Sequence, residues 1–362
     1  MTNKVYINGL GCVSPQRTSD FRLFREGPVT VVGNRLKAID PNYKDFIPSD
    51  MIRRMGRIIK MGVAAAKMCL ADSRHQAVQG QPGIPEKIIT GTGLGCIEDT
   101  EKFLSSMIRN REEFLTPTSF IQSTHNTVSA QIAILLKCHG YNFTYVHRGF
   151  SFETALLDCL MQLDTRSPGN ILLGCADELT DHSFQIQHRL GFWKRNPVNN
   201  LELFASPGHG TIAGEGAAFF FLETTRQSNT YAAFIDCAML LRPVNQDDIH
   251  PWILRFLERT QLSPRDIDLI ITGKNGDPQG DARYHHVLSD LFPDTHSASF
   301  KHMCGEYHTA TGFASWLGAQ ILREQAVPAS ALPSGDPMNI NTILIYNHFH
   351  DINHSLILLS RP

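Results

Sequence analysis

Short apolar runs that end in glycine-containing turns recur along the chain. Four of them are clear: KVYINGLG, KIITGTGLG, NILLGCADE and DLIITGKNG. Each predicts a β-strand followed by a turn. Helical patterns alternate with them, as in residues 53–73, where Ile58, Met61, Ala65 and Cys69 recur at intervals of three or four positions. Alternating strands and helices predict a layered α/β fold.

These units recur in the same order later in the chain. The segment IITGTGLG at 88–95 is similar to IITGKNGD at 270–277, and the strand, glycine turn and helix of 144–163 are similar to those of 299–322. The order predicts two similar halves, residues 1–225 and 226–362, although ordinary strand–turn–helix units that match by chance are the alternative. Small residues fill positions 309–319, which predicts a helix enclosed on all sides.

Composition excludes several classes of protein. The 362 residues are 42% hydrophobic and 19% charged, with a formal net charge of −2. This balance supplies a large core and no charge excess that would favour nucleic acid or an anionic membrane. The opening MTNKVYINGLG lacks the apolar stretch of a signal peptide, and runs such as AAFFFL are too short to cross a bilayer. Eight scattered cysteines without a CxxC pair favour a reduced, cytoplasmic protein.

Five segments together carry a resemblance to a known family. They are KVYINGLGCVSP, RRMGRIIKMGVAAAKMCLADS, GTGLGCIEDTEKF, GEGAAFFFLE at 214–223 and KHMCGEYHTATGFA. Their order and spacing resemble the beta-ketoacyl synthase family nearly from end to end, and GEGAAFFFLE is the most specific single match. The resemblance implies a thiolase-like αβαβα sandwich built from two similar halves.

Synthases of this family condense acyl chains held on a carrier protein. A Cys at a helix N-terminus attacks the thioester, two His residues assist decarboxylation, and a Lys supports them. Here the nucleophile position matches Gly149, the first His position matches Gly273 or Lys274, and the second matches Glu306. Lys301 matches the family Lys.

The family's closing motif is a glycine-rich loop around a gating Phe. Phe349 matches that Phe, but the glycines beside it are replaced by His348, His350 and Asp351. The centre therefore departs from the family pattern at the nucleophile, at both His positions and at the gate.

The joint loss of these groups is typical of chain-length factors, family members that lack the nucleophile. The resemblance implies a non-catalytic subunit that forms a heterodimer with a Cys-bearing synthase, without a cofactor or metal, in fatty-acid, polyene or polyketide-type synthesis. The interface is expected around strand 142–147 and helix 125–137, and the acyl carrier protein is expected to dock mainly on the partner. Bulky side chains near the centre would limit chain length by excluded volume; Phe150, Phe152 and Phe349 are the candidates.

Two other functions remain open. The chain could be a divergent but active acyltransferase or decarboxylase that uses Lys301, Glu306 or Cys304. It could also be a stand-alone acyl-binding scaffold without a synthase partner.

Several local hypotheses follow from residue types near the centre. Arg148 and Glu306 could form a buried ion pair, or Arg148 could reach solvent or the partner. Glu153, in the first turn of a helix, is favourable for the helix dipole. Cys304 and His308 could form a catalytic dyad, with a structural role for Cys304 as the favoured alternative.

The histidines, one long loop segment and the phenylalanines can each be interpreted functionally or as ordinary structural features. The segment HFHDINH at 348–354, with His285 and His286, has spacing that permits a metal site, although histidines often cluster in loops without metal. The stretch from Gln187 to Gly210 is rich in turn formers and predicts an excursion over the surface or over a pocket. Core packing is the ordinary explanation for the five phenylalanines of this region: Phe114, Phe120, Phe143, Phe150 and Phe152.

Overall fold

Ten strands form one continuous sheet whose two halves have the same strand order. The computed structural model describes residues 4–73, 84–113, 115, 117–163, 169–243, 248–332, 337 and 339–362, so Phe114 lies outside the described residues. The strands of the first half are β1 (Val5–Val13), β3 (Lys87–Gly91), β4 (Tyr141–Tyr145), β5 (Asn170–Asp177) and β7 (Gly216–Glu223). Those of the second half are β8 (Ala232–Leu241), β9 (Leu269–Thr272), β10 (His296–Ser299), β11 (Thr342–Phe349) and β12 (Asn353–Ser360).

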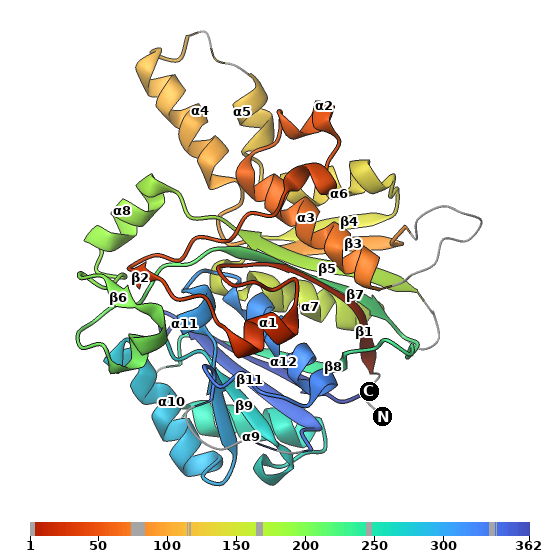
Figure 1. Ribbon diagram of the computed structural model, residues 1–362, viewed down its shortest axis with the longest axis vertical. Helices are drawn as coiled ribbons and strands as arrows, with labels where there is room; N and C mark the ends of the chain where they lie inside the picture. The colour runs from red at the N-terminus through yellow and green to blue at the C-terminus, as the bar shows by residue number, and fades with distance from the viewer. Residues whose placement is uncertain are drawn as a thin grey trace.

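The strand order confirms that the two halves are alike. The sheet runs β4-β3-β5-β7-β1 and then β8-β12-β11-β9-β10 (Figure 1). In each half the first three strands from the outer edge are parallel and the next two are antiparallel. The halves join where Val5–Ile7 pair with Ala232–Phe234. The loop between β7 and β8 contains residue 225, and we propose this loop as the boundary between the halves.

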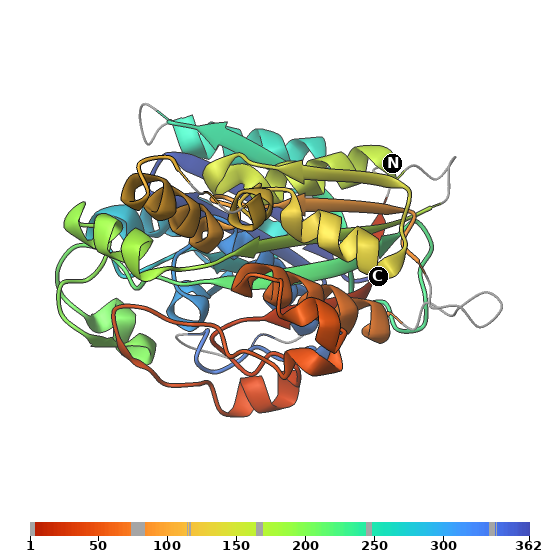
Figure 2. The same cartoon turned by 90° about the horizontal axis from the view of Figure 1, so that it is seen from above.

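Helices cover both outer faces and fill the space between the halves. The central helices α7 (Ser151–Gln162) and α12 (Ala310–Glu324) contact strands of both halves. Helices α3 (Arg57–Asp72) and α6 (Thr127–Leu136) lie outside the first half, and α9 (Ile249–Arg259) and α10 (Pro278–Leu291) outside the second. In Figure 2 the red-to-orange segment that includes α3 lies along one side of the molecule. The result is the αβαβα layering predicted from the resemblance.

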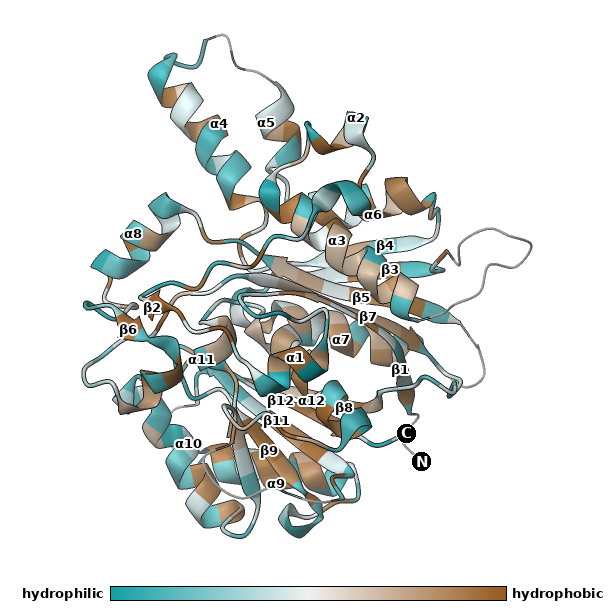
Figure 3. Ribbon diagram, in the orientation of Figure 1, coloured by the Kyte–Doolittle hydropathy of each residue, from teal (hydrophilic) through white to brown (hydrophobic). Residues whose placement is uncertain are grey.

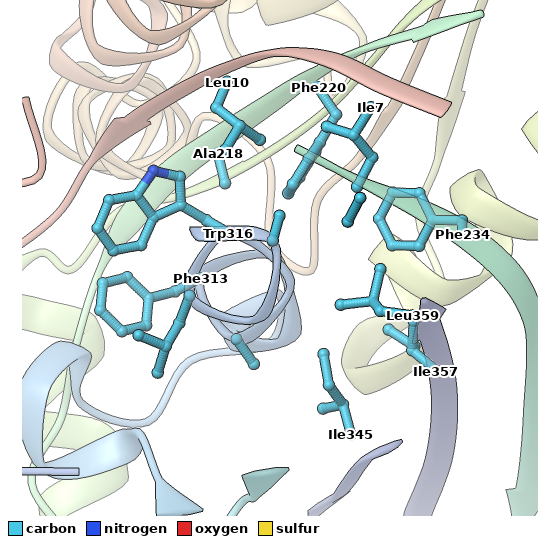
Figure 4. Packing of buried hydrophobic residues seen from close by; sticks show 14 of the residues in the cluster. Ile7, Leu10, Ala218, Phe220, Phe234, Phe313, Trp316, Ile345, Ile357 and Leu359 are labelled. Carbon is cyan, nitrogen blue, oxygen red and sulfur yellow. The ribbon is translucent and has the colours of Figure 1, made fainter. Parts of the chain in front are cut away.

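The small residues of α12 let it be enclosed, as the sequence predicts. Every residue from Ala310 to Leu322 is buried. A Cβ atom added at Gly312 would lie 2.3 Å from the Cys175 sulfur, so only glycine fits between α12 and β5. Figure 4 shows the side chains around this helix, from β1 and β7 on one side and from β8, β11 and β12 on the other: Ile7, Leu10, Ala218, Phe220, Phe234, Ile345, Ile357 and Leu359.

The remaining elements are short or lie around this core, and two of them, η3 and α11, are part of the buried centre. They are α1 (Phe21–Glu26), β2 (Val32–Gly33), η1 (Tyr43–Asp45), α2 (Ser49–Ile52), α4 (Ile97–Arg109), α5 (Pro117–Gln122), η3 (Arg148–Phe150), α8 (Asp181–Arg189), β6 (Val198–Asn199), η4 (Asn200–Ala205), η6 (Pro264–Asp266) and α11 (Lys301–Cys304). Helices α4 and α5 project from the body, and their surfaces mix polar and apolar residues (Figure 3). Within the described ranges, every helix is too short or too polar to pass through a bilayer.

Candidate functional site

The predicted strand, turn and helix at the nucleophile position are present. Strand β4 leads through η3 into α7, and Gly149 lies in η3, buried just before the helix. Arg148 has φ +50°, a left-handed conformation that costs a non-glycine residue free energy. The turn is closed by Ser151, whose hydroxyl accepts from the His147 amide and donates to the Arg148 carbonyl, both at 2.8 Å.

The space beside Gly149 is filled by the hairpin between β11 and β12. A Cβ atom added to Gly149 would lie 2.7 Å from Phe349 Cβ and 3.2 Å from Asn353 Cβ. The Phe349 ring packs against His308 and His350, with ring centroids 4.5 and 4.2 Å away. Any side chain at position 149 therefore requires Phe349 to move.

A buried ion pair involves Glu306, the residue that the resemblance matches to the second His position. The Lys301 ammonium donates to Glu306 Oε2 at 2.6 Å and to the His348 carbonyl at 3.0 Å, and both side chains are excluded from solvent. Asn275 Nδ2 donates to the same carboxylate oxygen at 2.9 Å. Glu306 is thus held by a cation and an amide, an arrangement that fixes its charge in place.

The loop after β9 contributes to the centre through a residue that the sequence analysis missed. Gly273 faces Asn347, whose Oδ1 lies 2.1 Å from a Cβ built on the glycine. Lys274 is half-buried, and burial lowers its pKa. The side chain that reaches Glu306 is Asn275, which also accepts a hydrogen bond from the Asp277 amide. The sequence did contain a signal for this turn: Asn-Gly-Asp is typical of a turn that is stabilised by a side chain.

Two hypotheses about the centre are not supported by the geometry. Arg148 is exposed, and the cation paired with Glu306 is Lys301, so the proposed Arg148–Glu306 pair is wrong. The left-handed backbone at Arg148 lies on the exposed side of the turn. Cys304 donates its thiol to the Gly305 carbonyl at 3.3 Å, and burial raises its pKa far above the ordinary value. Since the ring of His308 packs on Phe349, these contacts agree with the structural role for Cys304.

Three side chains of HFHDINH, those of His348, Asp351 and His354, contact α10 or other residues of the hairpin. The Asp351 carboxylate accepts three hydrogen bonds from the Nε and Nη2 groups of Arg283, at 3.0–3.3 Å, and lies 3.3 Å from His354 Nε2. His348 Nε2 is 3.0 Å from the Gly280 carbonyl, and His354 Nδ1 is 3.0 Å from the Tyr346 hydroxyl. In the part of the chain that the structure describes, no three His, Cys, Asp or Glu side chains are grouped so as to hold a metal ion.

Glu153 is a buried carboxyl group in the first turn of α7, between the two central helices and β12. Its Oε1 accepts from the Ser355 hydroxyl at 2.8 Å, whereas Oε2 has no hydrogen-bond partner among the described residues. Burial raises the pKa of Glu153 to about 7. The expected benefit from the helix dipole is therefore opposed by the cost of desolvation.

The segment from Gln187 to Gly210 covers a pocket, as one of the two alternatives predicted. Lys194 donates to four backbone carbonyls, which belong to Ser206, Pro207, Gly208 and Gly276, at 2.6–3.4 Å. These bonds tie the segment to the loop that carries Asn275. A cavity of about 210 Å³ lies between them, with Gly210, Asn275 and His350 in its lining, and it is smaller than most ligand pockets.

The GEGA motif joins the two halves at this centre. A Cβ atom on Gly214 would lie 2.1 Å from the Cys304 carbonyl oxygen, so glycine is needed for the close approach to α11. The Glu215 carboxylate accepts from the amides of Ala38 and Leu179, both at 2.9 Å, and pairs with Arg57 at 2.8 Å. The motif therefore has a structural role: Glu215 joins the segments of Ala38 and Leu179, and the Gly214 amide donates to the Glu306 carbonyl at 3.0 Å.

Comparisons with known proteins agree with this geometry. Residues 15–228 match the family model of the beta-ketoacyl synthase N-terminal domain. No curated protein matches the sequence. Among solved structures, the ishigamide ketosynthase/chain length factor aligns over 100% of both chains with 17% identity and a TM-score of 0.81.

Two further solved structures are complexes. A ketosynthase (ApeO) in complex with its chain length factor (ApeC) from Xenorhabdus doucetiae aligns over 99% of this chain and 98% of its own, with 15% identity and a TM-score of 0.80. AntDE:AntF, a type II PKS acyl-carrier protein in complex with its ketosynthase, aligns over 100% of both chains, with 14% identity and a TM-score of 0.77. At these identities the likeness establishes the shared fold.

Proposed function

The chain belongs to the beta-ketoacyl synthase family, and we propose that within this family it is a non-catalytic, chain-length-factor-type subunit. It would pair with a Cys-bearing ketosynthase in fatty-acid, polyene or polyketide-type synthesis. The observation that carries the proposal is the contact between Gly149 and Phe349. Position 149 has no nucleophile, and a Cβ there would lie 2.7 Å from Phe349.

The charged groups of the centre support the same role. In a working synthase, two imidazoles face the thioester and stabilise the developing negative charge. Here the corresponding side chain is the carboxyl group of Glu306, which is paired with Lys301, while Asn275 donates to the same oxygen. A carboxylate in this place would repel an enolate instead of stabilising it.

Strand β4 offers the surface for a partner. It is an end strand of the ten-stranded sheet, so one of its edges has no pairing strand within the described chain. Tyr141 and Phe143 are 43% and 46% exposed, and the rings of Tyr141, Phe143 and Tyr145 follow one another at 6.0 and 4.9 Å. An exposed apolar edge of this kind is typical of an association surface. On α6, Ile134 is 60% exposed, so the expected interface includes both elements.

The similar solved structures support the class of protein that we propose as the partner. Two of the similar solved structures pair a ketosynthase with a chain length factor or an acyl carrier protein. We propose that the carrier protein docks mainly on the partner of this chain, because the nucleophile must be supplied there. A cytoplasmic location fits this role, since all eight cysteines are buried and unpaired.

Phe150, Phe152 and Phe349 remain the proposed determinants of product length. Phe152 is fully buried against Phe220, with ring centroids 5.7 Å apart. Phe150 lies closer to the exposed turn, 5.5 Å from the ring of His147. Shortening Phe150 is therefore the change that best tests the length role without emptying the central core.

The test is co-expression of the full chain with the Cys-bearing ketosynthases of its source. We expect one of them to co-elute with the chain on size exclusion and to make products whose length depends on it. Phe143→Asp on β4 should abolish co-elution, whereas Ile186→Asp, at another exposed apolar position on α8, should not.

Each of the two alternative functions predicts a distinct experimental result. If the isolated chain turns over malonyl-carrier substrates, and Glu306→Gln or Cys304→Ala abolishes the turnover, the non-catalytic proposal is wrong. If no ketosynthase is retained while an acyl ligand is, the chain is a scaffold.

A further inference from the structure

The chain around the free edge of β4 carries basic side chains and no acid of its own. Residues 114–152, which include α5, α6, β4 and η3, contain no Asp or Glu. Four basic side chains of this stretch are exposed at the two ends of the strand: Lys137 and His139 precede β4, and His147 and Arg148 follow it. Since the chain as a whole has a net charge of −2, this edge differs in charge from the rest of the molecule.

Two acids of neighbouring elements lie near this surface. Asp158 of α7 accepts from Gln162 at 2.8 Å and from the Tyr141 hydroxyl at 3.4 Å. The Glu86 carboxylate lies on the side of β5, 2.9 Å from a Cβ built on Gly169, and so points away from the free edge of β4. The basic side chains at the ends of β4 are therefore left for an acceptor outside the chain.

Arg148 is held at this edge by a backbone conformation that favours glycine. Its φ of +50° is retained at a free-energy cost. The guanidinium is exposed, and within the described ranges no carboxylate pairs with it. The hydrogen bond that Arg148 accepts, from Ser151 Oγ at 2.8 Å, is made by its backbone carbonyl. A strained, exposed and unpaired arginine indicates that its side chain has a function.

A second copy of this chain would fit the edge poorly. Two copies related by a two-fold axis present the same strand to each other, in antiparallel orientation. The start of one β4 then lies beside the end of the other, so Lys137 and His139 of one copy face His147 and Arg148 of the second. Like charges that meet in an interface disfavour that pairing.

We propose that Arg148 binds a carboxylate of the partner ketosynthase, and that the basic ends of β4 select an acidic partner surface over a second copy of this chain. The inference rests on the proposed function, which supplies the partner. The two parallel donors of a guanidinium match the two oxygens of a carboxylate. The exposed rings of Tyr141 and Phe143 supply the apolar part of the same contact.

The first experiment measures the affinity of the full chain for the ketosynthase that co-elutes with it, at low and at high ionic strength. Arg148→Gln should weaken binding about tenfold, and Arg148→Lys should weaken it less, since lysine keeps the charge but not the paired donors. Salt should weaken binding of the parent more than binding of Arg148→Gln. Arg265→Gln, at an exposed arginine on η6, is the matched control and should bind as the parent does.

Arg148→Gly separates association from folding. Glycine adopts the left-handed conformation without strain, so the thermal midpoint of the isolated chain should stay at or above that of the parent. Binding to the ketosynthase should nevertheless fall as it does in Arg148→Gln. A role in folding alone would lower the thermal midpoint and the affinity together.

Sedimentation velocity of the isolated chain tests the selection against a second copy. The parent should be a monomer at low ionic strength. Arg148→Glu places a carboxylate opposite Lys137 of the second copy, so it should dimerise more strongly than the parent and bind the ketosynthase more weakly.

Two results would overturn the inference while the proposed function stands. One is a ketosynthase that binds Arg148→Gln as tightly as it binds the parent. The other is a parent chain that dimerises at low ionic strength as strongly as Arg148→Glu does. If the parent retains no ketosynthase, the proposed function is wrong and the inference fails with it.

Discussion

Lys301 and Glu306 form an ion pair with 2.6 Å between Nζ and Oε2, and neither side chain is reached by solvent. Removing one partner of a buried pair leaves a charge without compensation. Lys301→Met should therefore lower the free energy of unfolding by about 3–5 kcal/mol, measured by urea denaturation at neutral pH.

The control for this pair is an exposed one of similar length. Lys102 lies 2.8 Å from Glu98 on α4, and both side chains are largely solvated. Lys102→Met should change the free energy of unfolding by no more than about 1 kcal/mol. Equal losses in Lys301→Met and Lys102→Met would show that the buried pair does not stabilise the centre.

The packing of Phe349 on Gly149 can be measured with a double-mutant cycle. Gly149→Ala should destabilise the protein by about 1–3 kcal/mol, because the new methyl group overlaps Phe349. In a Phe349→Gly background the same change should cost less, since the Phe349 Cβ that lies 2.7 Å from the new methyl group is gone. Additive losses would mean that Phe349 does not occupy the nucleophile position.

The same contact predicts the reactivity of an introduced thiol. Gly149→Cys alone should distort the turn and react slowly with iodoacetamide, whereas Gly149→Cys combined with Phe349→Gly, which removes the obstructing Cβ and ring, should react readily. All eight native cysteines are buried, so background labelling will be low. Equal labelling of the two variants would contradict the steric argument.

Glu153 predicts a specific dependence of stability on pH. Burial raises its pKa to about 7 from 4.5, so the folded state holds the proton more tightly than the unfolded state. The resulting stability is fully present below about pH 4.5 and is lost as the pH rises through about 7, with a loss of about 3 kcal/mol. Glu153→Gln cannot lose a proton and should be more stable than the parent above pH 7.

The measurement is urea denaturation of both proteins between pH 5 and pH 8. Burial also raises the pKa of Glu178, to about 8, but Glu178 is present in both proteins and its effect cancels in the difference. Glu258→Gln, at an exposed acid on α9, should follow the parent curve. If the difference in the free energy of unfolding between Glu153→Gln and the parent does not change with pH over this range, Glu153 is not the group that titrates.

Lys194 links the segment over the small cavity to the loop of Asn275. Lys194→Met leaves the carbonyls of Ser206, Gly208 and Gly276 without their donor, and should destabilise the protein by about 2–4 kcal/mol. The loosened segment should also become sensitive to limited proteolysis near residues 206–210. Lys37→Met, at an exposed lysine, is the control and should leave the digestion pattern unchanged.

The fold could be predicted because its signals are local and repeated. Strand–turn–helix units such as 144–163 and 299–322 can be read from apolar runs and glycines, and their common order implies a common topology. The enclosed position of α12 followed from its small residues. These features depend on residue type at short range, which a sequence displays directly.

The contacts of the centre could be predicted only in part. The resemblance indicated Gly273 or Lys274 at the first His position, but the side chain that contacts Glu306 is Asn275, because the path of the loop decides which residue points inward. Arg148 was a plausible partner for Glu306 on charge alone, yet its left-handed backbone leaves it exposed. Lys194 was missed altogether, since its partners are backbone carbonyls, which no side-chain pattern reveals.

The contact between Phe349 and Gly149 also bears on how this subunit can evolve. A codon change that introduces a thiol at position 149 first meets a collision with Phe349, and the positions matched to the two His residues of the family hold Gly273 or Lys274 and Glu306. Under the proposed function, a lineage that carries this contact has no single-step route back to a self-sufficient synthase.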